Sequence, residues 1–166
     1  MAKTSVHVIE DPVQQLRERL AELEAENAGL RQLEATVQRN SNVIKAVLRK
    51  SREGFLLVTP ELTILRIVHS MLGNTNDGLV GQSMLTKTHP DDQGRVMEAF
   101  SRLLSDPSQS VTVEYRVSDA QGRWCWLEVE LTDMLDDPDV QAIVLNSRDI
   151  SERKRCEELI QQFNPQ

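Results

Sequence analysis

A leucine stripe near the start of the chain most constrains its fold. The stripe residues are spaced three and four apart and fill positions a and d of a heptad repeat: Val13 (a), Leu16 (d), Leu20 (a), Leu23 (d), Asn27 (a) and Leu30 (d). This spacing predicts a coiled coil. Leucine at d with a lone asparagine at a favours a parallel two-stranded coil, because the buried asparagine side chains pair in only one register.

The residues beside the stripe favour pairing with a second copy of the chain. In a parallel dimer Arg19 at g faces Glu24 at e of the partner, and Glu26 faces Arg31 in the same way. Each exposed pair contributes only about 0.2–1 kcal/mol, so these charges select the partner more than they stabilise the dimer.

The strict register weakens further along the helix, because Glu34 falls at position a and Leu33 moves into the stripe. An apolar face nevertheless continues and includes Val37 and Ile44. We therefore predict a register change near residues 31–37.

We predict a flexible N-terminus over residues 1–11 and a coiled-coil helix over residues 12–51. Asp11 can accept hydrogen bonds from the free N–H groups of the first turn, and Pro12 is tolerated at the first helical position. Packing of the helix on its own domain is the alternative to a coiled coil. A leucine-zipper transcription factor is excluded, since no basic helix directly precedes the stripe.

Negative charge is concentrated in the middle of the chain. The net charge is −7, and residues 51–147 hold 15 acidic but only 7 basic side chains. This distribution weighs against nucleic-acid binding, because phosphate contacts need clustered Lys and Arg. No apolar run has the length of a membrane span or a signal peptide. We expect a cytoplasmic protein, without a membrane partner, in which Cys125 and Cys156 are reduced.

The middle of the chain changes from helical to strand periodicity. The pattern predicts strands over 54–58 and 62–68, a helix over 90–104, and strands over 111–117, 123–131 and 141–146. Asp119 to Gly122 forms the hairpin turn between the third and fourth strands. Two strands, a helical stretch and three strands are typical of an α+β fold with an antiparallel sheet.

Four passages, in this order, resemble motifs of the PAS sensor-domain family. They are Leu79–Ser83 (LVG turn), His89–Asp92 (HPDD helix start), Glu114–Arg116 with Gly122–Glu128 (EYR…RWxWLE hairpin), and Arg148–Lys154 (RDISERK, against the family's RDITERK). The resemblance implies a PAS domain over 52–150, with a five-stranded antiparallel sheet flanked by short helices and a PAC-type motif at its end. It also implies a sensory or interaction module that relays a signal through its flanking helices.

PAS domains hold flavin, haem, small metabolites or no ligand. Residues 81–87 lack the reactive cysteine of flavin photosensors, and residues 90–104 lack a histidine for haem. His89 is better explained as a structural residue at a helix start, and His69 as an ordinary polar residue at the end of the second strand. We predict no cofactor and no metal, and leave open an unknown small-molecule ligand. A haem- or flavin-binding sensor is the alternative.

A ligand pocket in such a domain would be lined by inward-facing residues. The residues we predict for it are Met71, Leu72, Met84, Leu85, Phe100, Val113, Tyr115 and Leu127. These side chains could equally well only fill the core. No phosphate loop, nucleophile elbow or paired carboxylates indicate catalysis, so we predict that the protein is not an enzyme.

Strand alternation places Trp124 and Trp126 on the outer face of the sheet, where large apolar side chains usually mark an interface. Coverage of side chains within their own domain is the alternative. The dimer interface that we predict comprises Leu16, Leu20, Leu23, Asn27, Leu30, Val37, Ile44, Trp124 and Trp126.

The passage Asp149-Ile150-Ser151 is the predicted output site. Asp149 can cap the linker helix expected over 151–166, and Glu152 lies three residues further on. The predicted partners are a second copy of the chain and an effector such as a histidine kinase or another regulator. A pure dimerisation scaffold is the further alternative.

Overall fold

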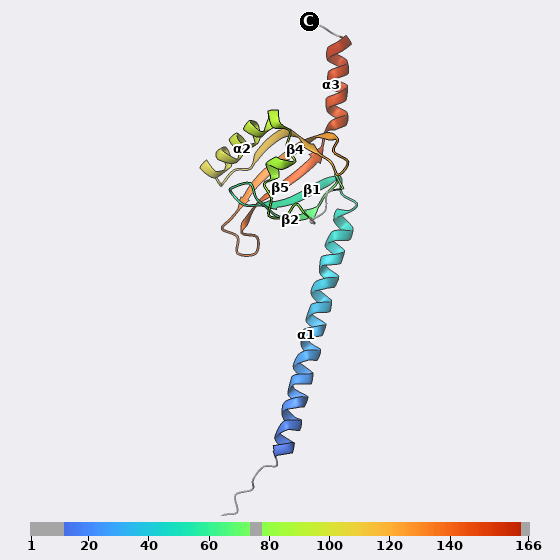
Figure 1. Cartoon of the computed structure of the whole chain (residues 1–166), viewed down its shortest axis with the longest axis vertical. Helices are drawn as coiled ribbons and strands as arrows, with labels where there is room; N and C mark the ends of the chain where they lie inside the picture. Colours follow the sequence, from blue (N-terminus) through green and yellow to red (C-terminus); the bar gives the residue numbers. More distant parts are fainter. Residues whose placement is uncertain (1–11, 74–77, 164–166) are drawn as a thin grey trace, which may run out of the picture. The chain divides into compact units, whose positions relative to one another are not determined.

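The computed structural model describes residues 12–73 and 78–163. The expected N-terminal segment 1–11, which contains Asp11, and the last three residues of the expected linker helix lie outside the described residues. The chain divides into two units between Ile44 and Lys45, and each is described by itself. The elements, shown in Figure 1, are α1 (Pro12–Leu48), β1 (Glu53–Val58), β2 (Ile64–His69), η1 (Met84–Thr86), η2 (Pro90–Asp92), α2 (Gln93–Ser105), β3 (Val111–Ser118), β4 (Trp124–Met134), β5 (Ala142–Asp149) and α3 (Ser151–Phe163).

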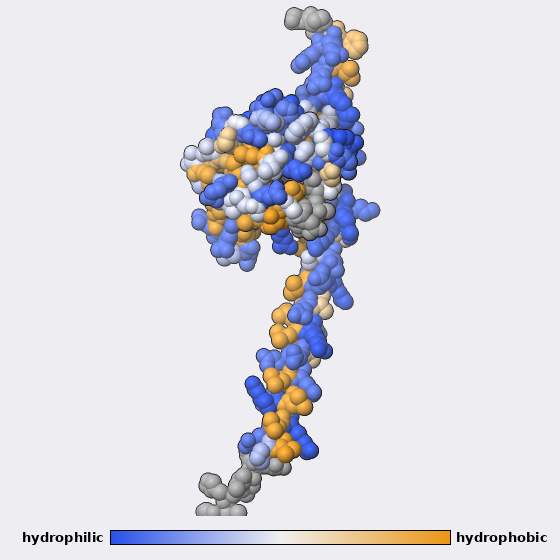
Figure 2. All heavy atoms as spheres, viewed as in Figure 1, coloured by the Kyte–Doolittle hydropathy of each residue, from blue (hydrophilic) through white to orange (hydrophobic). Residues whose placement is uncertain are grey.

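Helix α1 is uninterrupted over its 37 residues and buries none of its side chains. The predicted stripe is exposed along its length; Leu16, for example, is 70% exposed. Figure 2 shows apolar side chains recurring along the helix. The long N-terminal helix is thus confirmed, whereas its pairing as a coiled coil stays a prediction. No helix among the described residues is long and apolar enough to cross a membrane.

The helix ends at Leu48, slightly before the expected residue 51. The N–H groups of Lys50 and Ser51 donate to carbonyls three residues earlier, at 3.0 and 2.9 Å. This tightens the last turn out of α geometry, as is common at helix ends.

Five strands form one antiparallel sheet in the order β2-β1-β5-β4-β3, which confirms the predicted fold class. The last strand of the sequence, β5, therefore lies in the middle, between β1 and β4. Strand β3 lies at one edge.

Helix α2 buries one face against the sheet (Figure 1). Its buried residues recur at helical spacing: Val96, Ala99, Phe100 and Leu103. The helix begins at Gln93 and not near Pro90 as expected, because Pro90–Asp92 form a separate 3₁₀ turn. In that turn His89 Nδ1 accepts a hydrogen bond from the Asp91 N–H at 3.2 Å, which agrees with the structural role expected for His89.

The segment from η1 to α2 seals the outer edge of β3. Four hydrogen bonds reach the backbone of this strand: His89 N to Arg116 O (2.9 Å), Ser118 N to Lys87 O (2.8 Å), Arg116 N to Asp92 Oδ2 (2.9 Å), and an Arg95 guanidinium N–H to Glu114 O (2.8 Å). Edge groups that would otherwise be free to pair with another chain are therefore occupied.

Candidate functional site

A cavity of about 100 Å³ lies on the inner face of the sheet. Its lining is mostly apolar and includes five of the residues expected there: Met71, Leu72, Met84, Tyr115 and Leu127. The other three do not line it. Phe100 and Val113 are buried in the core, and Leu85 packs against that core while partly exposed.

Glycine at position 54 keeps one side of the cavity open. A Cβ at Gly54 would lie 2.6 Å from Ser147 Oγ and 3.3 Å from Met71 Cε. The Ser147 hydroxyl already donates to the Gly54 carbonyl at 3.1 Å, so the backbone and this side chain are in close contact. No feature of the sequence pattern had pointed to Gly54 as part of a pocket.

The cavity is small compared with most ligand pockets. Pockets for drug-sized ligands usually span about 300–1,000 Å³. A volume of about 100 Å³ does not fit haem or flavin. Within 12–73 and 78–163, no group of three or more His, Cys, Asp or Glu side chains could hold a metal ion.

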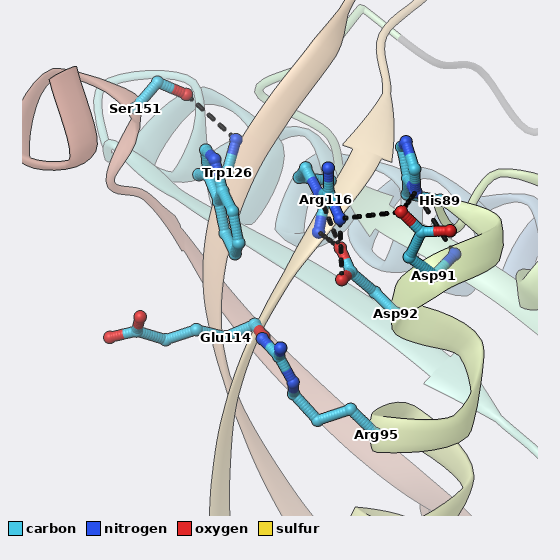
Figure 3. A network of polar contacts seen from close by, with 8 residues as sticks. All are labelled: His89, Asp91, Asp92, Arg95, Glu114, Arg116, Trp126 and Ser151. Atoms are coloured by element: carbon cyan, nitrogen blue, oxygen red, sulfur yellow. Dashed lines mark hydrogen bonds and ion pairs between the residues drawn. The ribbon is translucent and has the colours of Figure 1, made fainter. Parts of the chain in front are cut away.

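A second cluster lies on the outer face, where α3 meets β3 and β4. Both Arg116 Cζ and Lys154 Nζ lie 5.1 Å from the ring centroid of Trp126, within the range of cation–π contacts. The backbone N–H of Trp126 donates a hydrogen bond to Ser151 Oγ at 3.0 Å (Figure 3). Trp126 thus joins the first turn of α3 to the sheet.

Charges strengthen this junction. Lys154 Nζ lies 2.7 Å from a carboxylate oxygen of Glu114, and Arg153 also pairs with that carboxylate. The hydrogen bond from Lys154 lowers the pKa of Glu114. The same bond raises the pKa of Lys154. Both groups are therefore held in their charged forms.

A buried ion pair positions Arg116 beside Trp126. Asp92 is 1% exposed, and its carboxylate accepts Arg116 Nε at 2.8 Å and a terminal guanidinium N–H at 3.0 Å. Figure 3 shows the guanidinium between Asp92 and the Trp126 side chain. The side-chain hydrogen bond from Arg116 lowers the pKa of Asp92. The EYR and HPDD passages contain these two residues, but neither motif indicates that they pair.

The three expected output residues lie together where β5 passes into α3. Asp149 Oδ1 accepts the Ser151 N–H at 2.8 Å. Ile150 is buried, and its N–H donates to Trp126 O at 2.9 Å. These bonds fix the start of α3 against β4.

The other tryptophan also has a neighbour within its domain. Trp124 is 49% exposed, and its ring centroid lies 4.7 Å from that of His89. The role of Trp124 and Trp126 in a dimer interface stays a prediction. Both cysteines are free thiols: Cys125 is partly buried and Cys156 is exposed.

Comparison with known proteins identifies the fold. Residues 62–143 match a family model described as PAS fold. No curated protein matches the chain at a significant level. The match indicates no catalytic family.

Solved structures are similar over most of their length. The PAS domain of an HTR-like protein from Haloarcula marismortui is 18% identical, with a TM-score of 0.57, over 72% of this chain and 99% of that one. The PAS domain of a Colwellia psychrerythraea protein is 13% identical, with a TM-score of 0.55, over 70% and 98%. A sensory box histidine kinase/response regulator from Burkholderia thailandensis is 20% identical, with a TM-score of 0.51, over 70% and 90%.

Proposed function

Because this chain contains a domain of the PAS fold, we propose that it is a homodimeric, cytoplasmic sensory or interaction module. It relays a signal through its flanking helices to an effector such as a histidine kinase or another regulator. In this proposal residues 12–51 dimerise, residues 52–150 form the sensory domain, and residues 151–166 carry the output.

One observation supports the relay most directly: the cavity and the α3 junction use neighbouring residues of the same two strands. On β3, Tyr115 lines the cavity, and both residues beside it, Glu114 and Arg116, contact the junction. On β4, Leu127 lines the cavity next to Trp126. Successive side chains of a strand point to opposite faces.

This alternation supplies a short mechanical path. A ligand that displaces Tyr115 or Leu127 displaces the adjacent backbone, and with it the groups that hold Lys154 and Ser151. Because the hydrogen bonds at Asp149 and Ile150 attach the start of α3 to the sheet, we expect α3 to move when β4 moves. A change on the inner face is therefore expressed as a change in the docking of α3.

Dimerisation is supported by α1. Its stripe is exposed, and large exposed apolar surfaces usually mark an interface. The opposite charges of Arg19 and Glu24, and of Glu26 and Arg31, complement those of a parallel second copy. The proposed interface includes the stripe residues through Val37 and Ile44, together with Trp124 and Trp126.

The exposed thiol of Cys156 on α3 allows a direct test. A nitroxide at Cys156, in a Cys125→Ser background, would report the distance between the two α3 helices of a dimer by pulsed electron paramagnetic resonance. We expect one narrow distance distribution, which broadens in Asp149→Ala because the Ser151 N–H loses its acceptor.

Asp136→Ala, an exchange of the same type at an exposed turn residue, is the control and should leave the distribution narrow. A monomer in analytical ultracentrifugation would refute dimerisation. A dimer whose distribution is the same in Asp149→Ala would refute the relay and favour a pure scaffold.

A further inference from the structure

Tyr115 lines the cavity and carries a hydroxyl that has no partner among the described residues. Tyr115 is the single tyrosine of the chain and is only 3% exposed. Polar groups of buried side chains in native proteins are almost always hydrogen-bonded, so this hydroxyl is available to a molecule in the cavity that Tyr115 lines.

The neighbouring hydroxyl groups do not offer the same opportunity. Thr88 Oγ1 donates to Met84 O at 3.2 Å, and Ser147 Oγ donates to Gly54 O at 3.1 Å. The rest of the lining is dominated by aliphatic and methionine side chains. Ser70 also lines the cavity, but it is only partly buried, and its Oγ accepts the Leu72 N–H at 3.3 Å. Among the lining hydroxyl groups that donate to no described residue, that of Tyr115 therefore belongs to the more deeply buried side chain.

The volume limits the size of that ligand. An apolar cavity of about 150 Å³ is large enough to take up benzene. At about 100 Å³ this cavity fits a somewhat smaller molecule. That corresponds to roughly four non-hydrogen atoms, with some adjustment of the walls.

The surroundings of Tyr115 also disfavour a negative charge. Burial raises the pKa of its hydroxyl, since the phenolate would have to be desolvated, and an anionic ligand at the same depth meets the same penalty. The cationic side chain of the lining, Lys87, and His69 are both only partly buried. These two side chains are therefore better placed to contact water at the entrance of the cavity than a ligand in its interior.

We propose that the cavity binds a small, uncharged, mostly apolar molecule whose oxygen accepts a hydrogen bond from the Tyr115 hydroxyl. This inference rests on the proposed sensory function and names the chemistry of its ligand. Tyr115 is then the residue that distinguishes an oxygenated ligand from a hydrocarbon of equal size.

A pair of isosteric probes tests the inference on the full chain. Acetone carries an acceptor oxygen, and isobutene has the same planar shape with a CH₂ group in place of that oxygen. Because the chain has one tyrosine, protein labelled with ¹³C-tyrosine gives a single Cζ resonance that reports hydrogen bonding at Tyr115. We expect saturable binding of both probes, with a Cζ shift for the ketone alone and about two- to tenfold tighter binding of the ketone.

Tyr115→Phe, followed through the amide signals of Gly54 and Ser147, should bind both probes equally. If Tyr115→Phe fails to fold, the double variant Gly54→Ala/Ser147→Ala replaces it. Ser147→Ala removes the oxygen that would clash with the new methyl group at position 54, and this methyl group then projects toward Met71. Binding of both probes should weaken in this variant. Equal affinities in the wild-type protein, or no saturable binding, would overturn the proposal. Ultracentrifugation of the same samples reports dimerisation separately, so a failure of either proposal is recognised by itself.

Discussion

Lys154, on the first turn of α3, lies 2.7 Å from the carboxylate of Glu114 on β3, and its ammonium group also lies 5.1 Å from the Trp126 ring centroid. One side chain of the helix thus contacts, on the outer face of the sheet, two of the strands whose inner face lines the cavity. This contact makes the docking of α3 sensitive to substitutions far from the helix itself.

Replacement of Glu114 by glutamine should loosen α3. The variant loses the ion pairs to Lys154 and Arg153, and because these side chains are partly exposed the cost is about 0.5–1 kcal/mol. Hydrogen exchange of the α3 amides should accelerate correspondingly. Glu158→Gln, at an exposed position of α3, is the matched control; equal acceleration in both variants would contradict the assignment.

The same pair predicts the pH dependence of α3 docking. The pKa of Glu114 is lowered, so its contribution is complete above the unfolded-state value and disappears as the pH falls through the folded-state value. The pKa of Lys154 is raised, so its contribution is complete below the unfolded-state value and is lost as the pH rises through the folded-state value. Slowest exchange of α3, corrected for the intrinsic rate, is expected between these limits, and Glu114→Gln should abolish the acidic loss.

Asp92→Asn should destabilise the whole PAS-fold domain. The change removes the negative charge and one of the two oxygens that accept from Arg116, and the other carboxylate paired with Arg116, that of Asp91, lies 3.8 Å away; since Arg116 is partly exposed, a loss of about 2–3 kcal/mol is expected in urea unfolding. The lowered pKa of Asp92 means that the wild-type advantage is present above the unfolded-state value and shrinks as the pH falls. Asp91→Asn, at a neighbouring side chain that is mostly exposed, should lower the free energy of unfolding far less. An equal loss in both variants would show that the Asp92–Arg116 ion pair does not stabilise the domain.

Asn27→Leu should stabilise the proposed dimer while relaxing its specificity. A leucine at this position removes the cost of burying an amide, but it also removes the pairing that selects two parallel strands. Sedimentation equilibrium should show tighter association and species larger than a dimer. Gln32→Leu, at an outward position of the heptad, should change neither property. A sharp dimer in Asn27→Leu would mean that Asn27 does not lie in the seam.

Asn146→Val should raise the free energy of unfolding by about 1 kcal/mol. The Oδ1 atom of Asn146 is buried and has no partner among the described residues, and an unpaired buried acceptor is costly. Valine also suits a strand position better. Thr132→Val, on β4 and exposed, is the comparison. If only Asn146→Val weakens self-association, the amide oxygen serves a partner and the stability prediction is wrong.

Most of the fold could be predicted from local sequence patterns. The alternation of Val111 to Val117 and the turn at Asp119 concern neighbours in sequence, so periodicity and turn chemistry suffice to place them. The sequence pattern did not predict that η2 is separate from α2, because this separation depends on a contact between Asp92 and Arg116, which lies on a strand distant in sequence. A helix-start motif alone cannot indicate such a contact.

The candidate site, too, could be predicted only where it depends on local sequence patterns. Tyr115 and Leu127 could be placed on the inward face by strand alternation, whereas Phe100 and Val113 share the inward orientation but lie in the core. The cluster around Trp126 joins Arg116, which lies on a neighbouring strand, with Lys154, which lies on a helix. The Arg116–Trp126 contact follows from the hairpin whose turn could be predicted at Asp119. The contact of Lys154 depends on where α3 lies relative to β4, which strand periodicity does not indicate.

The sealed edge of β3 bears on how the protein behaves at high concentration. A bare edge strand can recruit the edge of another molecule, and that molecule leaves its own edge free, so growth has no natural end. The bonds from Lys87, His89, Asp92 and Arg95 close this route on one side of the sheet. Variants that release the segment before α2, such as Asp92→Asn, are therefore expected to precipitate as well as to unfold more easily.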